Sequence, residues 1–136
     1  MAKGSGGGGR GGGGGIIQSD YAPSARDYIN SSDQVVSAIH SNTNLDAYVD
    51  PKENTIYLAH SISGREVGEI NIETGRITTT ADRFRASVER AKDIAERTVI
   101  IANAQRELNL LRNYPIRNSS RITNLQRFID KTTEGI

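Results

Sequence analysis

The chain has 136 residues, and because 10 of its 14 glycines fall at its start, the sequence predicts a flexible Gly-rich leader over 1–15 and a single domain over 16–136. The absence of Cys excludes disulfides and thiolate metal sites, the two His lack a zinc-ligand spacing, and no apolar run approaches the roughly 18 residues of a membrane span. The net charge of +1 conceals an acidic half, 16–75, with three basic and nine acidic residues, and a basic half, 76–136, with 12 basic and 7 acidic residues. Because nucleic-acid-binding domains generally present an uncompensated basic surface, the chain is a poor candidate for that class.

The first predicted elements are two short helices between residues 21 and 40. Pro23 suits the first turn of a helix, where its missing amide hydrogen costs nothing. Val35 and Ile39 lie four residues apart, which gives the second helix an apolar stripe. Both helices are expected to pack on a core.

A sheet is predicted after these helices, because the apolar residues then recur with a period of two. All connections are of hairpin length, so we expect an antiparallel meander. The predicted strands are 45–49, 55–60, 65–72 and 76–80. In the third strand, Gly68 predicts a bulge or a close approach of another part of the backbone.

The longest predicted element is a helix over 81–113, which continues without Gly or Pro until Pro115. At about 1.5 Å per residue it would be about 50 Å long, longer than the roughly 35 Å of a compact domain of this size. A last helix that starts at Ser119 or Ser120 is expected to fold back and cover less than half of it. We therefore expect a homo-oligomer formed through the long helix, or else a curved or kinked helix in a monomer. The small side chains that would let a second helix approach are those of Ala91, Ala95 and Ala102.

Together these elements predict an α+β fold. It consists of a four-stranded antiparallel β-meander packed on a long α-helix, with short N-terminal helices and a C-terminal helical hairpin.

Arginine outnumbers lysine 13 to 4, and arginine binds planar anions such as phosphate and carboxylate through two parallel hydrogen bonds. Four arginines surround the expected turn of the helical hairpin: Arg112, Arg117, Arg121 and Arg127. We predict that they bind a phosphate-bearing small molecule or the carboxylates of a partner protein. The alternative is that they pair with the acidic half of the same chain.

His60 is placed as a catalytic base would be, at a strand end beside a turn, with Arg65 and Glu66 close in sequence. The three residues could serve as base, phosphate clamp and acid in a small metal-independent ribonuclease. The strand alternation puts His60 on the face of Ile56 and Leu58, however, so a histidine at the edge of the core is the competing interpretation. No metal, cofactor or phosphate-loop motif is present, and we expect neither a metal nor a cofactor.

The opening Met-Ala-Lys-Gly-Ser-Gly-Gly resembles the leaders of small proteins from phages and mobile elements of gut Bacteroidales. The resemblance implies a protein of the bacterial cytoplasm that acts on host machinery or host defences by binding. We therefore expect a small soluble, non-catalytic binding protein, such as a phage-type inhibitor or sequestering protein, whose partner is a host protein or a phosphate-bearing small molecule. The alternatives are the ribonuclease and a nucleic-acid-binding accessory protein that uses the basic half.

Overall fold

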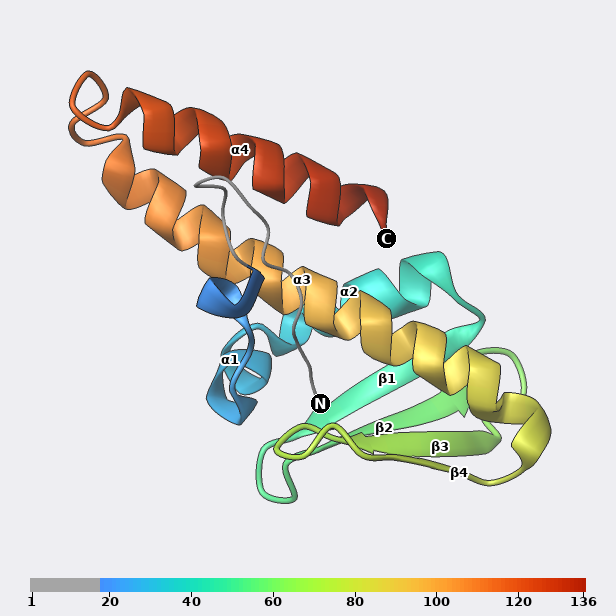
Figure 1. The fold of residues 1–136 in the computed structure, drawn as a ribbon. Coiled ribbons are helices and arrows are strands. Elements are labelled where there is room, and N and C mark those ends of the chain that lie inside the picture. Colours follow the sequence, from blue (N-terminus) through green and yellow to red (C-terminus); the bar gives the residue numbers. More distant parts are fainter. Residues whose placement is uncertain (1–17) are drawn as a thin grey trace.

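The computed structural model describes residues 18–136, so the leader expected over 1–15 lies outside the described residues (Figure 1). The described chain has the predicted α+β architecture. Its elements are η2 (Gln18–Tyr21), α1 (Ala25–Asn30), α2 (Ser32–Asn42), β1 (Leu45–Asp50), β2 (Thr55–His60), β3 (Glu66–Asn71), β4 (Ile77–Thr79), η3 (Asp82–Phe84), α3 (Arg85–Leu111) and α4 (Ser119–Glu134).

The two predicted N-terminal helices are confirmed. Ser24 starts α1 through a capping box, in which its hydroxyl accepts from the amide of Asp27 and the Asp27 carboxylate accepts from the amide of Ser24. Val35 and Ile39 of α2 are fully buried, as their stripe predicts.

The four strands form one antiparallel sheet in chain order. The register shifts between Leu58 and Ala59, opposite Gly68, so the predicted bulge is confirmed. The close approach is present as well, because a Cβ added to Gly68 would lie 2.5 Å from the carbonyl oxygen of Thr78. Only glycine fits at this position without a shift of the sheet.

Helices α2 and α3 cover one face of the sheet (Figure 1). The main core lies between them, and its largest buried side chains come from both layers: Val35, Ile39, Ile56, Leu58, Val67, Val88, Ile94 and Val99. No described helix packs on the opposite face. We call this the outer sheet face, and strand alternation places on it Asp46, Tyr48, Tyr57, Glu66 and Glu69.

The long helix is shorter than predicted. α3 has 27 residues and is about 40 Å long, because Asp82–Phe84 forms a 3-10 turn before it and the chain leaves the helix after Arg112. Its N-terminal half packs on the sheet, and its C-terminal half packs on α4 and η2. The residues buried in this second contact, the hairpin core, are Tyr21, Ile100, Ala104, Leu108, Leu125 and Ile129.

This arrangement corrects the expected overhang of the long helix. The 16 residues of α4 cover the part of α3 that extends beyond the sheet. Ala91 and Ala95 are fully buried in the main core, and Ala102 is half-buried. Ala91 and Ala95 therefore already serve packing within the chain, and a homo-oligomer through the long helix stays a prediction.

Candidate functional site

The α3–α4 hairpin ends in a loop, 112–118, that its own hydrogen bonds hold in place. The amide of Asn118 donates to the carbonyl oxygen of Tyr114 at 3.1 Å. The side-chain amide of Asn118 also donates to the carbonyl oxygen of Leu111 at 3.0 Å, which satisfies one of the free carbonyls at the end of α3. The side chains of the loop are thus presented from an internally bonded backbone.

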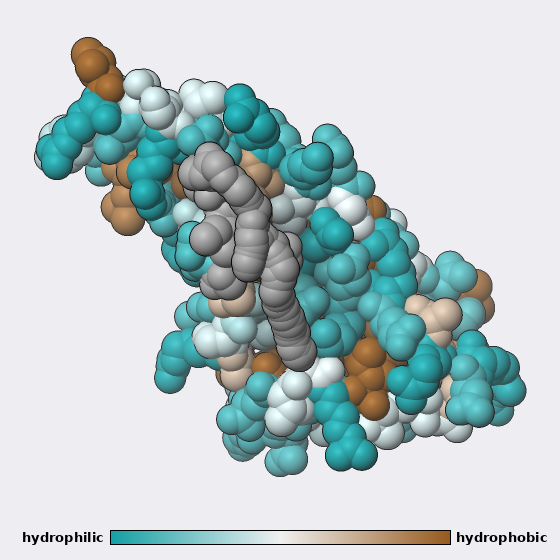
Figure 2. Space-filling model, viewed as in Figure 1, coloured by the Kyte–Doolittle hydropathy of each residue, from teal (hydrophilic) through white to brown (hydrophobic). Residues whose placement is uncertain are grey.

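Three large apolar side chains at this end of the hairpin are exposed to solvent, one from the last turn of α3 and two from the loop. Leu110 is 68% exposed, Tyr114 64% and Ile116 92%. Figure 2 shows hydrophobic side chains at this far end of the hairpin. Clustered exposed apolar groups mark interaction surfaces. Sequence analysis missed these residues, although Tyr114 and Ile116 flank Pro115 in a loop, where polar residues are usual.

Two of the predicted arginines, Arg112 and Arg117, lie at the same end of the hairpin. The guanidinium carbon of Arg117 is 5.9 Å from the centre of the Tyr114 ring. Arg112 donates to the side-chain oxygen of Gln126 at 3.2 Å, across the two helices. We use the name hairpin tip for the surface formed by Leu110, Arg112, Tyr114, Ile116 and Arg117.

Arg112 and Arg127 meet beside the tip in an open groove of about 380 Å³. Arg127 forms no ion pair with any residue that the structure describes. The groove also contains one carboxylate, that of Asp130, which accepts from the side chain of Gln126 at 3.0 Å. The two guanidinium groups can contact a small anion that enters there.

Arg121 is separated from this group. It lies six residues before Arg127 on α4, which is about 120° around the helix. It forms an ion pair with Glu107 of α3, and Glu107 also accepts a hydrogen bond of 3.1 Å from the hydroxyl of Tyr21. Burial and the carboxylate of Glu107 raise the pKa of Tyr21 to about 12, so its hydroxyl keeps the donated proton at neutral pH. Arg121 is therefore engaged in holding the hairpin together.

The surface around the tip is positively charged. Between Glu107 and Asp130 the chain has four arginines and no acidic residue. Of the six ion pairs in the described part, five lie within 76–136 and the sixth joins His40 to Asp46 in the acidic half. None joins the two halves, so the structure does not support pairing of the hairpin arginines with the acidic half of the same chain.

His60, Arg65 and Glu66 do not form a shared site. The amide of His60 donates to the carbonyl oxygen of Arg65 at 2.8 Å, at the end of the β2–β3 hairpin. Glu66 pairs with Ala59 and lies on the outer sheet face, whereas His60, the next residue of β2, lies on the inner face. A base and an acid on opposite faces cannot act on one phosphate. The ring nitrogen Nδ1 of His60 instead accepts from the amide of Ile62 at 3.4 Å, within its own turn.

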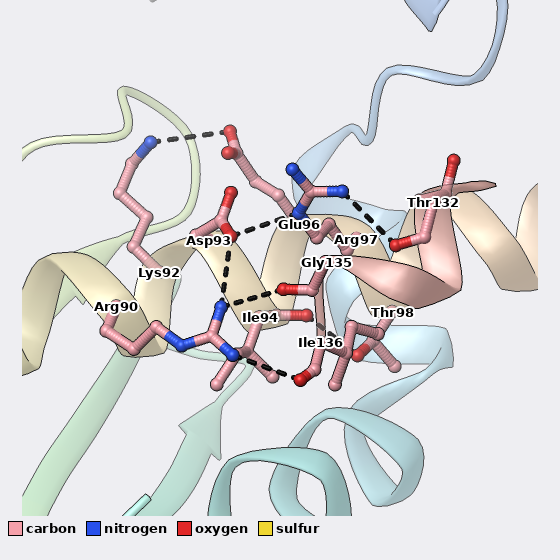
Figure 3. Close-up of polar contacts among 10 residues, drawn as sticks. All are labelled: Arg90, Lys92, Asp93, Ile94, Glu96, Arg97, Thr98, Thr132, Gly135 and Ile136. Carbon is pink, nitrogen blue, oxygen red and sulfur yellow. Dashed lines mark hydrogen bonds and ion pairs between the residues drawn. The ribbon is translucent and has the colours of Figure 1, made fainter. Parts of the chain in front are cut away.

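A second arginine cluster holds the end of α4 against α3 (Figure 3). Arg90 and Arg97 donate hydrogen bonds of 2.8 to 3.2 Å to the carbonyl of Thr132, in the last turn of α4, and to those of Gly135 and Ile136, which follow the helix. Asp93 lies between the two arginines and accepts from both, at 3.3 and 3.0 Å. Cations stabilise the negative end of a helix, so this cluster has a structural role. The sequence shows that Arg90, Asp93 and Arg97 share one face of α3. It does not show that the two arginines bind carbonyl groups at the end of α4.

Among residues 18–136, no group of three or more His, Asp or Glu is placed to hold a metal ion. In the same range, no helix combines the length and apolar character needed to cross a membrane. Comparison with protein-family models, with curated proteins and with solved structures finds no match for the chain. The hairpin tip and the charges around it therefore carry the functional inference.

Proposed function

We propose that the protein is a non-catalytic binding protein and that the hairpin tip binds an acidic surface of a partner protein. One observation carries this proposal: three highly exposed apolar side chains lie among arginines, in a stretch of chain without acidic residues. Ile116 and Tyr114 would fill apolar pockets, and Arg112 and Arg117 would pair with carboxylates around them.

The composition of the tip is typical of a binding surface. Tyrosine and arginine are enriched among the residues that dominate binding energy. Because the loop is bonded to itself, little conformational freedom would be lost on binding. The positive field of the hairpin would also increase the rate of encounter with an acidic partner.

A phosphate-bearing small molecule is the second candidate, and the groove between Arg112 and Arg127 favours it. Such a ligand would leave the exposed Ile116 uncovered, so the protein partner agrees better with the whole surface. The hypothesis that the protein is a ribonuclease has less support, because His60 and Glu66 lie on opposite faces of the sheet. Nucleic-acid binding has less support than a protein partner, since a phosphate backbone offers nothing apolar for the tip to contact.

The biological context that we propose follows from the resemblance of residues 1–7 to the leaders of small phage and mobile-element proteins. A phage-type inhibitor or sequestering protein would meet its partner in the cytoplasm of the bacterial host. The partner would be a host protein or a component of host defence.

The test compares two equally exposed isoleucines. The full chain, with Ile116→Asp or Ile62→Asp, is used to recover partners from the producing cells, and recovered proteins are quantified by mass spectrometry. Ile62 is 90% exposed in the β2–β3 turn, so it is a matched control far from the tip. We expect the wild type and Ile62→Asp to recover the same protein, and Ile116→Asp to lower its recovery about tenfold or more, as loss of a dominant contact does.

The proposal is wrong if Ile116→Asp recovers the same proteins in the same amounts as Ile62→Asp. The small-molecule candidate is tested separately with ATP. A rise in melting temperature with ATP that is lost in Arg127→Gln and kept in Ile116→Asp would favour that candidate over a protein partner.

A further inference from the structure

The outer sheet face is a second surface that the chain leaves without a helix. Tyr48 is 62% exposed, and its ring stacks on that of Tyr57 with 6.5 Å between the ring centres. Tyr57 pairs in register with Glu69, and Glu66 lies in the neighbouring row. The face therefore presents two aromatic rings beside two carboxylates.

Of the carboxylates on this face, that of Asp46 contacts His40, whereas those of Glu66 and Glu69 have no such contact among the described residues. The cations nearest in sequence are at the turns between strands, where Lys52, Arg65 and Arg76 lie. Desolvation and the surrounding carboxylates, first that of Glu69, raise the pKa of Tyr57, in agreement with a negative field over the face.

The hairpin tip has the opposite properties. It combines exposed apolar groups with Arg112 and Arg117, and arginine stacks on aromatic rings as well as pairing with carboxylates. The tip and the face lie at opposite ends of the molecule, joined by α3 (Figure 1). The tip therefore cannot reach the face of its own chain, but it can reach the face of another.

We propose that the outer sheet face is a docking site for the hairpin tip of a second copy of this chain. This inference rests on the proposed binding role of the tip and gives the tip a second partner besides the host protein. The contact joins two different surfaces, so each copy keeps one free face and one free tip, and association continues head to tail. It uses other surfaces than the expected association through α3, where Ala91 and Ala95 are buried.

The size of the face predicts a weak, reversible contact. Four strands about 4.8 Å apart, with up to six residues each at about 3.3 Å, make a face roughly 20 Å across. Such a face buries less than the roughly 1,200 Å² of total area that stable interfaces need. We therefore expect association at micromolar concentrations that weakens as salt screens the charges.

Sedimentation velocity of the full chain over a range of concentrations tests the proposal. The face variant carries Glu66→Lys and Glu69→Lys, and the tip variant carries Arg112→Gln and Arg117→Gln. A control with Glu89→Lys and Glu134→Lys changes the net charge as the face variant does, on exposed helix positions away from the face. Circular dichroism checks that all four proteins are folded.

We expect the wild type and the control to associate at low salt, and each of the two test variants to be monomeric alone. An equimolar mixture of face and tip variants should form a 1:1 dimer and nothing larger, because only one intact face and one intact tip remain between them. The proposal is overturned if the wild type stays monomeric at every concentration, or if the face variant associates as the wild type does. Either result leaves the proposed function standing if Ile116→Asp still loses a partner from cells.

Discussion

Tyr21 shows how one residue outside the long helix helps to fix the hairpin. Its ring packs on Phe128 of α4, with 5.5 Å between the ring centres, and its hydroxyl donates to Glu107 of α3. Glu107 in turn pairs with Arg121 of α4. A single carboxylate therefore links three segments of the chain, and its neighbours determine how the link responds to pH.

Alkaline pH should break this link. The pKa of Tyr21 is raised to about 12 by burial and by Glu107, so the stability that its neutral form contributes is complete below about pH 10 and is lost as the pH rises towards 12. Urea unfolding of the wild type and Tyr21→Phe at pH 9 and pH 11.5 measures this contribution. From pH 9 to pH 11.5, we expect the free energy of unfolding of the wild type to fall by up to about 2 kcal/mol more than that of Tyr21→Phe. The pKa of Tyr28 is also raised, but Tyr28 is present in both proteins, so its contribution cancels in the difference between them. An unchanged difference would contradict the assignment.

At the scale of elements, the packing of α4 on α3 depends on which leucines face inward. Leu108 is fully buried in the hairpin core, whereas Leu110, two residues later, is mostly exposed at the tip. Leu108→Ala should lower the free energy of unfolding by about 3 kcal/mol, because it leaves a cavity. Leu110→Ala should change it by less than about 0.5 kcal/mol. Thermal or urea unfolding of the two variants compares the same change at two positions of one helix, and equal losses would contradict the described packing.

Most elements could be predicted from local pattern. The alternation of Ile56, Leu58 and their neighbours gave the strands to within a residue or two, and Gly68 gave both the bulge and the close contact. The ends of the long helix could not be predicted as well, because residues 82–84 suit a 3-10 turn and an α-helix alike.

The site was predicted only in part, for a different reason. The sequence makes Arg112, Arg121 and Arg127 equivalent, since each is an arginine near the same turn. Which of them faces Glu107 depends on how α4 lies against α3, and that is a property of the packed pair. The exposure of Ile116 likewise depends on the loop, although its place beside Pro115 was visible.

At the scale of the whole molecule, α3 joins two cores that do not otherwise share a long element. Val88 and Val99 belong to the core under the sheet, whereas Ala104 and Leu108 belong to the hairpin core. If one core unfolded, about half of α3 would lose its packing partner, and an unpacked helix of about a dozen residues is marginal in water. The two cores should therefore form one cooperative unit.

Substitutions in the two cores test this cooperativity. Ile56→Ala in the sheet and Leu125→Ala in α4 should each lower stability by about 2 to 5 kcal/mol and shift one common transition. Far-UV circular dichroism and tyrosine fluorescence should give the same midpoint for each variant. A second transition in either variant would show that the hairpin and the sheet unfold separately.

The continuity of α3 also fixes how far the hairpin tip stands from the sheet. About half of the helix extends beyond the sheet, and because it contains no Gly or Pro, it holds the tip at a constant distance of about 20 Å from the sheet. If copies join tip to face, every copy therefore holds its neighbour at the same distance from its own sheet. The spacing of such a filament would depend on the number of α3 residues that lie beyond the sheet.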